Sequence, residues 1–146
     1  MSLAKASFLS AAFVLLGTSC APMHHRHHHD DEGMMPRPFL PCTSGVCKAQ
    51  VTVIDCERGQ LAVTPDPIEV DAPNNMEWTI VTPGYKFDPT RGIAVAGPGF
   101  TPRGASGNKF TVHNGHERNG YFKYTVNAVR DGGGACAPFD PYINNR

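Results

Sequence analysis

The sequence predicts an all-β protein: an antiparallel Greek-key β-sandwich of about seven or eight short strands behind a disordered N-terminal tether. Two stretches, residues 76–82 and 120–131, alternate side chains with the period of two that half-buried strands show. Glycine and proline are frequent, at 15 and 13 residues, as expected for short strands joined by many turns. No helical period follows the N-terminal segment, which favours the all-β class.

We expect one folded domain, spanning residues 42–146. Its central strands are the two alternating stretches: the first contains Trp78, the only tryptophan, and the second places Phe122 and Tyr124 on one face. Pro65 and Pro67 predict a rigid corner, because each fixes φ and removes a ladder donor. The strands are predicted, in order, at residues 48–56, 60–64, 67–70, 76–82, 85–87, 92–96, 109–113 and 120–131, with a loop at 97–107 and a hairpin loop at 114–119.

The first twenty residues have the pattern of an export signal. Lys5 provides a positive start, and the apolar run at 7–17 is shorter than the about 20 residues that span a bilayer. Residues 17–20 resemble the lipobox of bacterial lipoproteins, in which Cys20 becomes lipidated. Gly17 departs from that pattern, which usually has leucine there, so cleavage after Ala21 is the alternative. We expect an exported protein, in the periplasm or on the outer membrane surface, with a lipid anchor in the membrane.

Four cysteines remain when Cys20 is set aside, an even number that predicts two disulfides in an exported chain. Four cysteines allow three pairings. We favour one bond that closes a short loop and one that ties an early strand to the C-terminal segment. A zinc or copper thiolate site is the alternative, although no second close pair follows the first. The favoured pairing is Cys42–Cys47 and Cys56–Cys136.

Residues 21–41 lack apolar periodicity and predict a flexible tether. They contain five histidines within six residues, followed by Asp30, Asp31 and Glu32. Imidazoles at this density can chelate Ni²⁺, Cu²⁺ or Zn²⁺, although a flexible chain binds with modest affinity. We favour a solvated spacer, with weak metal binding and a tag as the alternatives. The candidate metal ligands are His24, His25, His27, His28 and His29.

The turn-rich strand pattern is similar to immunoglobulin-like and cupredoxin-like sandwiches. From Trp78 onward the chain also resembles a group of small exported bacterial proteins of unassigned function. The shared features are Trp78, the turn at 84–87, the strand at 122–126 and the end at 140–145. The departure is Phe122, where that group has tyrosine. This resemblance implies a fold and carries no activity.

The folded part carries few signals of chemistry. His113 and His116 are its only histidines, and we expect a solvated hairpin tip there, with weak metal binding as the alternative. Blue copper is not expected, because no histidine or methionine follows Cys136. No nucleophile elbow or carboxylate pair is recognisable, and the zero net charge offers no footprint for nucleic acid.

The function predicted from these observations is a non-catalytic binding or structural module of the cell envelope, which contacts envelope proteins through loops or strand edges. The alternative is capture or buffering of a transition metal by the histidine tract, which would make that metal the only cofactor.

Overall fold

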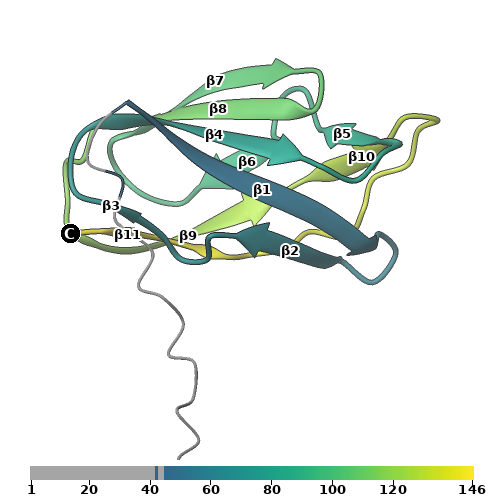
Figure 1. The fold of residues 1–146 in the computed structure, drawn as a ribbon, viewed down its shortest axis with the longest axis horizontal. Coiled ribbons are helices and arrows are strands. Elements are labelled where there is room, and N and C mark those ends of the chain that lie inside the picture. Colours follow the sequence, from purple (N-terminus) through teal and green to yellow (C-terminus); the bar gives the residue numbers. More distant parts are fainter. Residues whose placement is uncertain (1–41, 43–44) are drawn as a thin grey trace, which may run out of the picture. The chain divides into compact units, whose positions relative to one another are not determined.

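The computed structural model describes Cys42 and residues 45–146, which form eleven strands (Figure 1). The predicted all-β class is confirmed for this part of the chain. None of its elements is a helix, so none is a candidate for a helical membrane span. The strands are β1 (Val46–Asp55), β2 (Gln60–Thr64), β3 (Ile68–Val70), β4 (Asn74–Ile80), β5 (Tyr85–Phe87), β6 (Ile93–Val95), β7 (Phe100–Ser106), β8 (Lys109–Asn114), β9 (Gly120–Val126), β10 (Ala128–Arg130) and β11 (Tyr142–Asn145).

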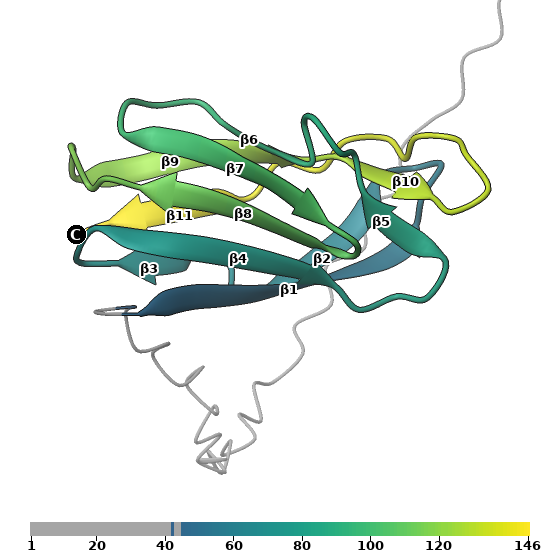
Figure 2. The ribbon, with the colours of Figure 1, turned by 90° about the horizontal axis from the view of Figure 1, so that it is seen from above.

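The strands form two main sheets. One sheet has the order β2-β1-β4-β8-β7, and the other has the order β3-β11-β9-β6. Figure 2 shows β1, β4, β8 and β7 side by side, and it places the small β10-β5 sheet at the end opposite the C-terminus. The strands that the sequence predicted as central are confirmed, since β4 is the middle strand of the first sheet and β9 is an inner strand of the second.

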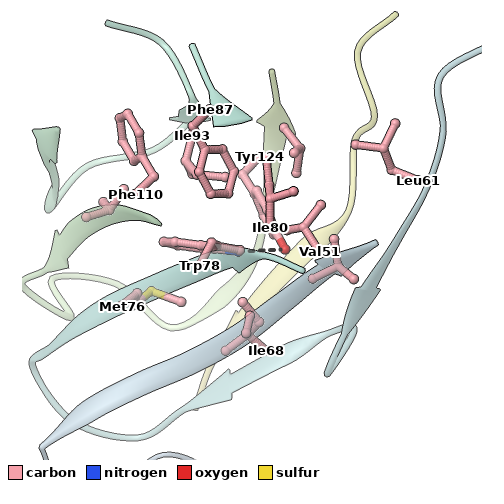
Figure 3. Close-up of a cluster of buried hydrophobic side chains, with 14 of the residues drawn as sticks. Val51, Leu61, Ile68, Met76, Trp78, Ile80, Phe87, Ile93, Phe110 and Tyr124 are labelled. Atoms are coloured by element: carbon pink, nitrogen blue, oxygen red, sulfur yellow. Dashed lines mark hydrogen bonds between the residues drawn. The ribbon is translucent and has the colours of Figure 1, made fainter. Parts of the chain in front are cut away.

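The core lies between the two sheets, where the inward side chains of β1, β4, β8, β9 and β11 meet. Trp78 and Tyr124 are almost fully buried at its centre, with ring centroids 5.4 Å apart. The indole Nε1–H of Trp78 donates to Tyr124 Oη at 3.2 Å (Figure 3). The alternation read from the sequence therefore identifies the residues that join the sheets.

The sheets are mixed, which corrects the antiparallel prediction. β1 runs parallel to β4, with Val46 opposite Asn75, and β3 runs parallel to β11. A period of two places side chains on faces but contains no information on the direction of a neighbouring strand. The structure also has more strands than the seven or eight predicted, because β7 and β11 were not predicted and the predicted strand at 120–131 is divided into β9 and β10. The Greek-key connectivity stays a prediction.

Residues 100–106 were predicted as loop and instead form the edge strand β7. β7 pairs with β8, and its register shifts between Pro102 and Gly104, so Arg103 is the extra residue of a bulge. Gly104 has φ of 101°, which a residue with a side chain rarely adopts. Pro102 is tolerated because an edge strand needs ladder donors on one side only. Pro102 and Gly104, which suggested a loop, therefore belong to the bulge of an edge strand.

Residues 114–119 do not form the predicted hairpin, because β8 and β9 belong to different sheets. A pair of buried amides lies at this crossover: Asn114 Nδ2 donates to Asn145 Oδ1 at 2.8 Å. The predicted strand at 120–131 is also divided, with β9 ending at Val126 and β10 beginning at Ala128. Between them the Asn127 amide donates to the backbone oxygen of Arg91 at 2.6 Å.

The structure contains both predicted disulfides, Cys42–Cys47 and Cys56–Cys136. The first lies at the start of β1, where Cys42 also forms a bridge with Val70, the last residue of β3. The second joins the residue after β1 to the segment that follows β10. Two disulfides are consistent with an exported protein in an oxidising compartment.

Candidate functional site

The predicted lipidation and metal residues lie outside the part of the chain that the structure describes. They are Cys20 in the predicted signal segment (1–20) and His24, His25, His27, His28 and His29 in the predicted tether (21–41).

The structure does not bring His113 and His116 to a common point. His113 lies on β8 and its Nδ1 is 3.1 Å from Asn75 Oδ1, whereas His116 Nε2 donates to the backbone oxygen of Val70 at 3.2 Å. His116 has a positive φ of 54°, and its own N–H donates to Asn114 Oδ1. In Cys42 and residues 45–146, no three histidine, cysteine or carboxylate side chains are grouped as metal ligands. His113 thus links two strands of the five-stranded sheet, β8 and β4, whereas His116 links the crossover segment to β3 of the four-stranded sheet.

The outer face of the four-stranded sheet carries the most prominent group of exposed side chains. Phe122 and Tyr124 of β9 are buried, so alternation turns their neighbours in the strand outward. On β11, Ile143 and Asn145 are buried and the residues between them face out. We call this group the tyrosine face; it consists of Tyr121, Lys123, Thr125, Tyr142 and Asn144.

The register of β9 and β11 makes the two tyrosines diagonal neighbours. Tyr142 lies opposite Lys123, and Asn144 lies opposite Tyr121. Diagonal neighbours in an antiparallel pair have Cα atoms about 7–8 Å apart, within reach of aromatic side chains. Tyr121 is 67% exposed and Tyr142 is 46% exposed, although tyrosine is largely apolar. Two exposed tyrosines thus occupy diagonal positions on one sheet face.

An ion pair lies beside the rings. Lys123 Nζ is 2.9 Å from Asp140 Oδ2, and Thr125 Oγ1 donates to Asp140 Oδ1 at 2.8 Å. The hydrogen bond from Lys123, and then that from Thr125, lowers the pKa of Asp140 below its ordinary value. The same hydrogen bond to Asp140 raises the pKa of Lys123. Both groups are therefore charged at neutral pH.

A second ion pair, between Arg146 and Glu69, bounds the face on the β3 side. Asn144 lies between this pair and Tyr121, since it is opposite Glu69 in β3 and opposite Tyr121 in β9. On the β6 side the outward side chains are small: Ala94, which is opposite Thr125, and Ala96, whose backbone N–H donates to the backbone oxygen of Lys123. The rings therefore lie between a polar margin and a margin of small side chains.

The outer face of the five-stranded sheet differs in chemistry. Its outward residues on the central strands are polar, for example Lys48, Glu77 and Thr111, which lie side by side. Its exposed apolar residues on β1 are the aliphatic Val46 and Ile54. Exposed tyrosines in adjacent strands thus distinguish one sheet face from the other.

The sequence prediction did not single out Tyr121 or Tyr142 as site residues. The alternation of side chains in residues 120–131 already placed Tyr121 on the face opposite Phe122, and this was the signal available in the sequence. The tail at 140–145 was not predicted as a strand, so nothing indicated that Tyr142 would lie beside Tyr121.

No model of a known protein family matches the chain, and no curated protein matches its sequence. A functional assignment therefore depends on the chain's own residues and their arrangement.

Proposed function

We propose that the protein is an exported, lipid-anchored module of the cell envelope that binds a partner through the tyrosine face and catalyses no reaction. The single observation that carries the binding role is the adjacent, solvent-exposed pair Tyr121 and Tyr142. Exposed aromatic residues are over-represented among residues that dominate binding energy, because they bury a large area with little loss of side-chain entropy.

The location is supported by the export pattern of residues 1–20, by Cys20 in a lipobox-like position and by the two disulfides. The resemblance to small exported bacterial proteins points to the same compartment. The anchor would hold the protein to the membrane through residues 21–41, and nucleic acid is not proposed as a partner because the chain has zero net charge.

Site-specific photocrosslinking in cells that export the full chain tests this proposal. A benzophenone amino acid replaces Tyr121 or Tyr142, or, as the control, Ile54, which is 68% exposed on the other sheet. We expect crosslinked species at positions 121 and 142 and none at position 54. Equal crosslinking at all positions, or none at the tyrosines, would contradict the proposal.

The second candidate function is binding of a transition metal by the histidine tract, favoured by its five histidines within six residues. Calorimetric titration of the oxidised protein with Ni²⁺, Cu²⁺ and Zn²⁺, beside a variant lacking residues 24–29, tests it. Micromolar or tighter binding that disappears in the variant supports metal handling. Weak binding that is equal in both proteins shows that the tract acts as a spacer.

A further inference from the structure

We infer that the ligand of the tyrosine face is an uncharged oligosaccharide strand. This inference rests on the binding role proposed for that face and names the chemistry of the partner. It follows from three properties of the face: the rings, the hydrogen-bonding groups beside them and the balance of charge.

The rings provide stacking surfaces. A sugar ring has a face of C–H groups, which carry partial positive charge, and an aromatic ring has a negative face. Tyr121 and Tyr142 are open to solvent, and their diagonal placement allows successive sugars of one chain to reach both. Each ring also has a hydroxyl that donates or accepts hydrogen bonds.

Groups that match sugar hydroxyls surround the rings. Sugar hydroxyls both donate and accept, so a complementary surface must offer both functions. Lys123 donates, Asp140 accepts, and the Asn144 amide does both. The Lys123–Asp140 pair and the Thr125 bond already hold these groups in place, which lowers the entropy that binding must offset.

The charge balance favours an uncharged ligand. Lys123 is paired with Asp140 and Arg146 is paired with Glu69, and the carboxylate of Asp66 accepts from the Tyr142 N–H at 3.3 Å, so the face has no excess positive charge to attract an anionic ligand. A protein partner is less well matched, because stable protein interfaces have an apolar core. The exposed apolar side chains on and directly after the neighbouring strand β6 are Ala94 and Ala96, which offer little area.

The test titrates the oxidised full chain separately with chitohexaose, cellohexaose and maltohexaose, followed by calorimetry and by amide chemical shifts. We expect saturable binding of at least one of these glycans, with shifts concentrated on β9 and β11. Tyr121→Ala and Tyr142→Ala should each weaken binding by about tenfold, whereas Tyr121→Phe keeps the ring and should retain most of it. Ile54→Ala is the matched control and should bind like the parent protein. Thermal unfolding of each variant shows that it is folded.

Two results overturn the inference and separate it from the proposed function. If none of the three glycans binds while crosslinks at positions 121 and 142 still form in cells, the ligand is of another class and the binding role stands. If glycans do not bind and the crosslinks are also absent, both the inference and the binding role are wrong. Binding that survives both alanine substitutions overturns the assignment of the glycan to this face.

Discussion

Trp78 and Tyr124 connect the two sheets through one buried hydrogen bond of 3.2 Å. Burial raises the pKa of Tyr124 above its ordinary range, so its hydroxyl stays neutral in the core. Tyr124→Phe removes the acceptor and leaves a buried indole N–H unpaired, which should lower the free energy of unfolding by about 1–3 kcal/mol. Urea denaturation measures the loss. Tyr142→Phe, at an exposed ring, is the control and should change stability by less than about 0.5 kcal/mol. An equal loss in the free energy of unfolding for both variants would show that the buried Trp78–Tyr124 hydrogen bond contributes little to stability.

The ionisation of Asp140 provides a prediction about pH. Its pKa in the folded protein lies below the ordinary value of 3.8, chiefly because Lys123 donates to it. The pair therefore stabilises the fold above about pH 4, and this contribution is lost as pH falls through the folded-state pKa. An NMR titration of the carboxyl carbon should show a midpoint below 3.8 that rises in Lys123→Met.

Asp88 is the matched control for that titration. Its pKa is also lowered, but by the backbone N–H groups of Arg91 and Thr90. Its midpoint should not move in Lys123→Met. A shift of Asp88 together with Asp140 would mean that the substitution acts through the whole structure and not through the ion pair.

At the scale of single elements, Gly92, directly before β6, is closely packed against the core. A Cβ at Gly92 would lie 2.5 Å from Phe110 Cδ2 and 2.7 Å from Phe87 Cβ. Gly92→Ala should therefore overpack the core and destabilise the protein by about 1–3 kcal/mol. Gly132→Ala is the control, because a Cβ there meets no atom within 4 Å. It should be neutral or stabilise by up to about 1 kcal/mol, since it restricts the unfolded chain. Denaturant midpoints of the two variants compare the sites directly, and similar midpoints would contradict the packing explanation.

At the scale of the whole molecule, the two disulfides differ in the length of chain they close. Cys56–Cys136 spans 80 residues and Cys42–Cys47 spans 5. In the chain-entropy model the long loop contributes about 4.5 kcal/mol and the short one about 2 kcal/mol. Replacing both cysteines of a pair by serine should therefore cost more stability at 56 and 136 than at 42 and 47, measured by urea denaturation. An equal or reversed loss would show that the bonds act on the folded state.

Much of the local structure followed from the sequence, because alternation is a property of each strand by itself. It identified the strands that contain Trp78 and Tyr124 as central and the face of Phe122 as buried. It failed at β7, where Pro102 and Gly104 resembled a loop, and at the tail, where β11 is only four residues long. Short strands are stabilised by their neighbours, so their own residues carry a weak signal.

The candidate site was predictable only in part for the same reason. Tyr121 could be placed on the face opposite Phe122, but its partner Tyr142 is brought to it by the pairing of β9 with β11. The ion pair of Lys123 with Asp140 likewise joins residues on either side of β10. The metal and lipidation predictions, at His24–His29 and Cys20, are unaffected by these findings because those residues lie outside the described part.

By itself the sequence determined the all-β class, the even set of cysteines that form the two disulfides, and the inward and outward sides of the main strands. These follow from composition and from a period of two, which depend on neighbouring residues only. The tertiary structure alone decided that β1 and β4 are parallel, that residues 114–119 cross between sheets, and that two tyrosines share one exposed surface. These properties depend on which distant segments pair, and the burial of the whole core determines that pairing.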